Sequence, residues 1–174
     1  MPRTKLFYES AAFKQYVAVN QRFADAIIAN YQDGDTSMSP SSQQSSFLLT
    51  LLVWVNDYHL MLLPALLRAS PRIPADTPIG FFMHVAFPSS EIFRCLSVRQ
   101  ALLKGLLAAD LVGFQTANFA RHFRQTVSRI LSYEALPKGI QLYDGAEGEG
   151  SRSRFVDVGV FPMGIDVDQL KEKK

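Results

Sequence analysis

The stretch VWVNDYHL at residues 53–60 decides the fold, because an apolar run ends there in a cluster of polar and ionisable side chains. The apolar residues predict a buried strand over 47–55, and the leucines that follow predict a helix over 59–69. In an open α/β sheet, ligands bind beyond the carboxyl ends of the strands. We therefore expect Asp57 to face a ligand rather than the core.

The pattern recurs at IGFFMH, residues 79–84, where a second apolar strand is predicted to end in His84. A carboxylate and an imidazole at two strand ends predict a site for a polar small molecule, with both groups side by side on a shared cleft. Two plainer readings remain open from spacing alone. Asp57 can cap the helix that begins near His59, and His84 can be a hydrogen-bonded structural histidine.

The rest of the chain alternates between helix and strand. Helices are predicted over 7–31, from 89–91, over 97–108 and over 117–132, and strands over 110–114 and 155–160. This alternation predicts an α/β fold, a parallel sheet with helices on both faces. The glycine-bearing region 133–154 is predicted to be loop-like, and the serine-rich stretch 35–46 a mobile loop.

The composition is that of a globular chain, with 174 residues of which 48% are hydrophobic and 20% charged. The formal charge of +2 equals that of the tail 171–174, which argues against a nucleic-acid surface. The single Cys95 excludes an internal disulfide and is predicted to be a buried small hydrophobe. No secretory signal or membrane-spanning run is visible, so we expect a cytoplasmic protein without membrane contact.

Several long blocks, in this order, resemble the trehalose-6-phosphate synthase family of retaining glycosyltransferases. They are VWVNDYHLMLLP (53–64), IGFFMH (79–84), FPSSEIFR (87–94), DLVGFQT (110–116), ARHF (120–123) and VGVFPMGID (158–166). The resemblance implies the GT-B architecture of two Rossmann-like domains. In that picture residues 1–170 are a partial N-terminal Rossmann-like domain, and 171–174 are a charged tail where the interdomain linker begins.

The resemblance also implies an activity: glucosyl transfer from UDP-glucose to glucose 6-phosphate, giving trehalose 6-phosphate and UDP. It assigns Asp57 to binding the acceptor sugar, His84 to catalysis beside the donor glucose, and Gln115 to a polar contact near the donor. It implies no metal and no cofactor other than the co-substrate UDP-glucose. Full-length synthase or trehalose-phosphate phosphatase subunits are the expected protein partners. Since the family's diphosphate-binding cations match nothing in this chain, the chain alone is expected to be inactive.

Some positions depart from the family pattern. Asn56 stands where histidine is usual, Val85 and Ala86 where threonine or serine and then proline are usual, and Ser97 where proline is common. These departures leave a second reading open, a non-catalytic regulatory or interaction subunit of a trehalose synthase complex. Residues 36–50 are either a genuine insertion or translated non-coding sequence.

Overall fold

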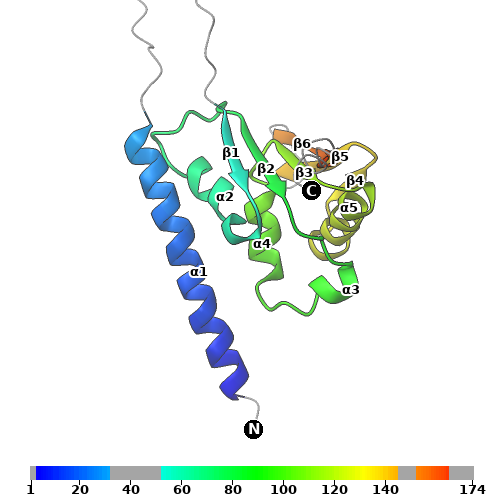
Figure 1. The fold of residues 1–174 in the computed structure, drawn as a ribbon, viewed down its shortest axis with the longest axis horizontal. Helices are drawn as coiled ribbons and strands as arrows, with labels where there is room; N and C mark the ends of the chain where they lie inside the picture. The colour runs from blue at the N-terminus through cyan, green and yellow to red at the C-terminus, as the bar shows by residue number, and fades with distance from the viewer. Residues whose placement is uncertain (1–2, 32–51, 145–151, 165–174) are drawn as a thin grey trace, which may run out of the picture.

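The computed structural model describes residues 3–31, 52–144 and 152–164, and its centre is a six-stranded sheet (Figure 1). The strand order is β1-β2-β3-β6-β5-β4. The strands are β1 (Val53–Asn56), β2 (Ile79–Met83), β3 (Leu111–Phe114), β4 (Glu134–Leu136), β5 (Gly139–Asp144) and β6 (Arg152–Val160). β1, β2, β3 and β6 run parallel, which confirms the predicted α/β class. The predicted loop 35–46, the glycine run 145–150 and the tail 171–174 lie outside the described residues.

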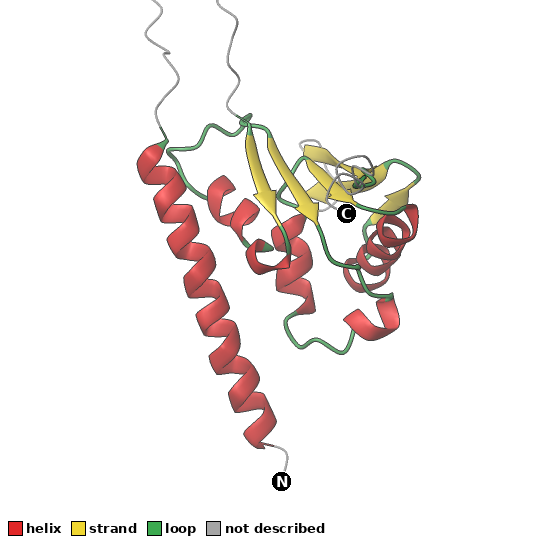
Figure 2. Ribbon diagram, viewed as in Figure 1, coloured by secondary structure: helices red, strands yellow, loops and turns green. Residues whose placement is uncertain are grey.

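The helices follow the predicted order, with one interruption (Figure 2). They are α1 (Arg3–Asn30), the 3-10 helix η1 (Tyr58–Leu60), α2 (Leu63–Arg68), α3 (Ser90–Phe93), α4 (Arg99–Leu106) and α5 (Ala117–Leu131). The single helix expected over 59–69 is therefore two pieces. Pro64 explains the break, because it has no N–H to donate to the carbonyl of Leu60 and is tolerated in the first turn of α2.

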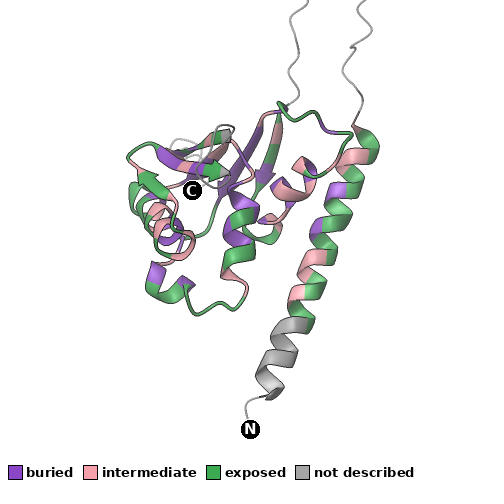
Figure 3. Cartoon of the chain, turned by 180° about the vertical axis from the view of Figure 1, so that it is seen from behind, coloured by how far each residue is buried: buried purple, intermediate pink, exposed green. Residues whose placement is uncertain are grey.

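One hydrophobic cluster joins the helices to a single face of the sheet. It combines buried residues of α2, α4 and α5 with alternate strand residues, among them Val55, Phe81, Val112, Phe114 and Val156. Figure 3 shows buried residues concentrated on α4 and on the strands beside it. Because alternate residues of a strand share a face, this cluster defines the covered face of the sheet.

The opposite face of the sheet carries apolar side chains that are only partly covered. Trp54, Phe155 and Phe161 are 44%, 37% and 45% exposed. The rings of Trp54 and Phe161 lie over the bare backbone of Gly80 and Gly113, where a Cβ atom would collide with them. The helices predicted on both faces are thus found on one face within the described residues. Continuously apolar strands are typical of a sheet that is covered on both faces. Within residues 3–31, 52–144 and 152–164, however, no helix covers the second face.

The prediction of a loop over 133–154 is wrong for its described part. β4 and β5 form an antiparallel hairpin around Pro137 and Lys138, and β5 continues the sheet beside β6. The glycines and acidic residues suggested a loop. The signal that was missed is the alternation of Ile140 and Leu142, which are 0% and 9% exposed.

Cys95 is exposed, so the prediction of a buried thiol is also wrong. It follows α3, where its Sγ lies 3.5 Å from the carbonyl oxygen of Glu91. The short helix buries Ser90 and Phe93 and leaves the residues after it on the outer surface. The general tendency of cysteine to be buried therefore gave the wrong prediction for Cys95.

Candidate functional site

Asp57 and His84 lie side by side at the carboxyl ends of the neighbouring parallel strands β1 and β2, as their positions predicted. The Asp57 Oδ1 atom accepts hydrogen bonds from the backbone N–H groups of Tyr58, at 3.0 Å, and of His84, at 3.3 Å. The Asp57 N–H in turn donates to the carbonyl of Phe82 at 2.8 Å. The strand pairing itself therefore sets the distance between the carboxylate and the imidazole.

The backbone of Asp57 is strained. Its φ of 69° and ψ of 166° fall in a region that is almost restricted to glycine, at a cost of about 1–3 kcal/mol. Asp57 is also the N-cap of η1, so the capping role considered from the sequence is real. The two backbone bonds use Oδ1 alone, and Oδ2 has no hydrogen-bond partner within the described part of the chain. This arrangement fixes the carboxylate and leaves one oxygen to accept from a ligand.

α1 holds the turn that follows Asp57. The Tyr16 hydroxyl donates to the carbonyl of Tyr58 at 2.6 Å and accepts from the N–H of Met61 at 3.0 Å. Burial raises the pKa of Tyr16, although the hydrogen bond from Met61 acts in the opposite direction. The phenol therefore stays neutral and bridges two backbone groups of the turn.

Asn20 of α1 makes a second attachment to the same turn. Its Nδ2 donates to the carbonyl of His59 at 3.0 Å, and its Oδ1 accepts from the N–H of Leu62 at 3.2 Å. The side chain is fully buried, so these bonds satisfy groups that water cannot reach. Sequence reasoning did not assign Tyr16 or Asn20 to the site. The available signal was a polar amide on the apolar stripe of α1.

The His84 ring is exposed and held by two neighbours. Its Nε2 lies 3.2 Å from Asn56 Oδ1, and its ring packs edge-on against Phe82 with centroids 4.7 Å apart. Gln115 fixes the backbone, because its Nε2 donates to the His84 carbonyl at 2.8 Å. The structure thus brings together all three predicted site residues. It adds Asn56, which the sequence marked only as a departure from the family.

The charge of the site comes from Asp57. The ion pairs of the described residues lie elsewhere, between Arg68 or Arg154 and Asp110, and between Arg129 and Glu91. In the same part of the chain, no three His, Cys, Asp or Glu side chains gather closely enough to hold a metal ion. A carboxylate oxygen, an imidazole and two carboxamides can together accept from and donate to the hydroxyl groups of a sugar.

Among the cavities of the described residues, one of about 570 Å³ and one of about 490 Å³ are lined by other residues than Asp57, His84 and Gln115. The smaller cavity is largely apolar and is lined by Tyr58 and Val85, each the residue next in sequence to one of the paired groups. His84 is exposed and Asp57 is half-buried, so the paired groups can be reached from solvent.

The structure defines a class of protein, the α/β domains with a parallel sheet and polar side chains gathered at its carboxyl edge. Within that class the chain belongs to glycosyltransferase family 20, whose family model matches residues 1–174. No helix within the described ranges is both long and apolar enough to cross a membrane.

Three known proteins illustrate the relationship. The chain is 42% identical to the alpha,alpha-trehalose-phosphate synthase (UDP-forming) 56 kDa subunit of Kluyveromyces lactis, over 97% of this chain and 30% of that protein. It is 41% identical to the trehalose synthase complex regulatory subunit of Saccharomyces cerevisiae, over 99% of this chain and 13% of that protein. The solved N-terminal domain of Candida albicans trehalose-6-phosphate phosphatase superposes with a TM-score of 0.71 at 35% identity, covering 94% of this chain and 29% of that one. The chain thus spans less than a third of each of these relatives.

Proposed function

We propose that this chain forms part of the sugar-binding half of a UDP-forming alpha,alpha-trehalose-phosphate synthase. The reaction would transfer glucose from UDP-glucose to glucose 6-phosphate with retention at the anomeric carbon. The observation that carries the proposal is the placement of Asp57 and His84 at adjacent strand ends, tied by the hydrogen bond from the His84 N–H to Asp57 Oδ1. Family membership and the similarity to the K. lactis synthase subunit support this activity over other reactions that a polar site at the carboxyl edge of the sheet could perform. A cytosolic location is part of the proposal.

Asp57 is the proposed acceptor ligand. An ionised carboxylate only accepts hydrogen bonds, and charge-assisted bonds are about twice as strong as neutral ones. Since Oδ1 is occupied by two backbone N–H groups, Oδ2 would accept from a hydroxyl of glucose 6-phosphate.

His84 is the proposed catalytic residue beside the donor glucose. Its ring would hydrogen-bond a donor hydroxyl and help to stabilise positive charge that develops at the anomeric carbon. Gln115 orients His84 through the backbone carbonyl, and its Oε1 would remain for a donor hydroxyl. Asn56 holds the ring from the other side and so serves as a positioning residue.

Binding of glucose 6-phosphate tests the acceptor assignment directly. We expect titration of the chain with glucose 6-phosphate to shift the backbone amide resonances of residues 57 and 84. In Asp57→Ala we expect the same shifts to require about tenfold more glucose 6-phosphate. A tenfold loss of affinity is the size of effect expected when one charge-assisted hydrogen bond is removed. Asp76→Asn, an exposed carboxylate on the loop before β2, is the matched control. Unchanged affinity in Asp57→Ala would remove the assignment.

Turnover by the chain alone is expected to be absent. Stabilising a departing diphosphate requires cations, and no lysine or arginine contacts Asp57, His84 or Gln115 in the described part of the chain. A coupled assay for UDP, with UDP-glucose and glucose 6-phosphate, should therefore give no signal above the buffer. Steady UDP release would contradict this expectation.

The second candidate function is a non-catalytic subunit that associates with complete synthase or phosphatase chains. It is favoured by the similarity to the S. cerevisiae regulatory subunit and by the departures at Asn56, Val85 and Ala86. Co-purification of the tagged chain with a full-length synthase would support it. A chain that elutes alone in the presence of the synthase would count against it.

A further inference from the structure

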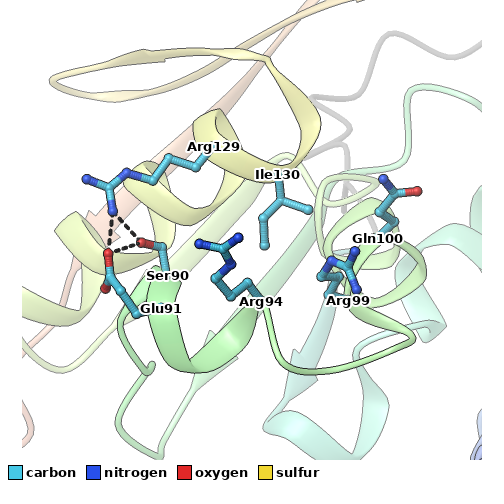
Figure 4. A pocket seen from close by; sticks show the side chains of 7 residues that line it. All are labelled: Ser90, Glu91, Arg94, Arg99, Gln100, Arg129 and Ile130. Atoms are coloured by element: carbon cyan, nitrogen blue, oxygen red, sulfur yellow. Dashed lines mark hydrogen bonds and ion pairs between the residues drawn. The ribbon is translucent and has the colours of Figure 1, made fainter.

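A polar cavity lies among α3, α4 and α5, outside the set of residues proposed for sugar transfer (Figure 4). Its volume is about 570 Å³, within the range of small-molecule sites. Three guanidinium groups and one carboxylate dominate the lining, which consists of Ser90, Glu91, Arg94, Arg99, Gln100, Arg129 and Ile130. The cavity is therefore cationic although residues 1–170 have no net formal charge.

Among the described residues, only one of the three positive charges is paired with a carboxylate. The Arg129 Nη1 atom lies 2.6 Å from Glu91 Oε1 and donates to Ser90 Oγ at 2.6 Å, as the dashed lines of Figure 4 mark. A hydrogen bond from its own backbone N–H, followed by bonds from Ser90, Ser89 and Arg129, lowers the pKa of Glu91 to about 2. Glu91 is thus ionised at neutral pH and compensates Arg129.

Arg94 and Arg99 supply the unmatched charge. Arg99 is oriented by a hydrogen bond from Nη1 to the carbonyl of Leu96 at 2.9 Å, which leaves its other N–H groups available. The Arg94 side chain has no hydrogen bond or ion pair with any residue in the described ranges. Figure 4 shows its guanidinium directed into the cavity, between the Glu91–Arg129 pair and Arg99. Two arginines on different helical segments thus point at one volume.

We propose that this cavity binds a phosphoryl anion, either inorganic phosphate or the phosphate of a monoester, with Arg94 and Arg99 as its principal ligands. The planar fork of a guanidinium matches two phosphate oxygens at once, which a point charge such as an ammonium group does not. Gln100 adds a neutral amide donor, and Ile130 adds an apolar surface for the carbon part of an ester. Binding would tie α3 and α4 together, because Arg94 follows α3 and Arg99 begins α4.

Inorganic phosphate is the probe that tests the site, in calorimetric titrations of the 174-residue chain at constant ionic strength. We expect saturable binding by the native chain and a loss of about tenfold or more in affinity in Arg94→Gln. Arg94→Lys keeps the positive charge but loses the planar guanidinium, so its affinity for phosphate should lie between those of the native chain and Arg94→Gln. Arg121→Gln is the matched control, because Arg121 lies on the exposed side of α5 and bonds Asn118 at 2.6 Å.

Further titrations separate this site from the proposed sugar site and identify the ligand. Asp57→Ala should bind inorganic phosphate with the affinity of the native chain, whatever the substitution does to the affinity for glucose 6-phosphate. Equal affinities for inorganic phosphate and glucose 6-phosphate in Asp57→Ala would identify the phosphoryl group alone as the ligand. A clear preference for the ester would extend the site to the sugar. Absence of phosphate binding, or an equal loss in Arg94→Gln and Arg121→Gln, would overturn the proposal. Arg99→Gln, tested by the same titration, decides the matter should Arg94→Gln fail to fold.

Discussion

Asp57 combines a strained backbone with two hydrogen bonds to its side chain, and these two effects oppose each other in the stability of the chain. Truncation to alanine removes the bonds and keeps the strain. Replacement by glycine removes the bonds and the strain together. Comparing the stabilities of the two variants therefore measures the backbone strain alone, because both variants lack the carboxylate.

We predict that Asp57→Gly is more stable than Asp57→Ala by about 1–3 kcal/mol, the range expected for relief of such strain. Urea denaturation of both variants and the native chain measures the difference. In both variants the backbone amides of residues 57 and 84 should respond equally weakly to glucose 6-phosphate, because neither variant has a carboxylate at position 57. Equal stabilities of the two variants would mean that residue 57 is not strained.

Gly80 offers a residue-scale test of the open sheet face. A Cβ atom there would collide with the ring of Trp54, the sole tryptophan of the chain. We predict that Gly80→Ala displaces the ring, shifts its fluorescence emission to longer wavelength and lowers stability by about 1–3 kcal/mol. Gly164→Ala is the control, since nothing lies within 4 Å of its Cβ position. An unchanged emission maximum in Gly80→Ala would show that the ring does not lie over Gly80.

At the scale of elements, α1 and the turn after β1 are joined by polar bonds rather than by apolar packing alone. Tyr16→Phe removes the hydroxyl that bridges Tyr58 and Met61, so we predict a loss of about 1–3 kcal/mol in the free energy of unfolding. Tyr58→Phe, which changes an exposed ring, is the control and should have little effect. Comparable losses in both variants would contradict the bridge.

The same tyrosine predicts a dependence on alkaline pH. Burial raises the folded-state pKa of Tyr16, so the unfolded chain loses this proton at a lower pH than the folded chain does. Its contribution is fully present below the unfolded pKa of about 10 and is lost as the pH rises through the folded pKa. Urea midpoints between pH 8 and 11 should therefore fall less steeply in Tyr16→Phe than in the native chain. Parallel curves would refute this assignment.

Strand ends, and with them most of the candidate site, were predictable from the sequence. Apolar runs that stop at Asp57, His84 and Gln115 place all three at one edge of a parallel sheet, whatever the packing of the helices. Asn56, Tyr16 and Asn20 were not predictable as site residues, because their roles arise from contacts between elements distant in sequence. The hairpin of β4 and β5 was missed because glycine content outweighed a short alternation of apolar residues.

At the scale of the whole molecule, the described helices cover one face of the sheet and leave the other face partly open. The open face presents Trp54, Phe155 and Phe161, each more than a third exposed. Contiguous apolar surface of this kind favours association. We predict that the chain self-associates with rising concentration, and that Phe161→Ser shifts the sedimentation profile toward monomer. Ile92→Ser, an exposed apolar position on α3, is the control and should leave association unchanged. A monomer at all concentrations would contradict the prediction.

The two attachments of α1 to the turn at residues 58–62 would couple this helix to the proposed affinity for sugar. Tyr16 and Asn20 are not among the proposed substrate ligands, yet they hold the turn that follows Asp57. Binding of another protein to α1, or proteolysis of α1, would break these hydrogen bonds, and it would thereby lower the affinity for glucose 6-phosphate. The affinity of the proposed site would thus depend on a helix that contributes no ligand to it.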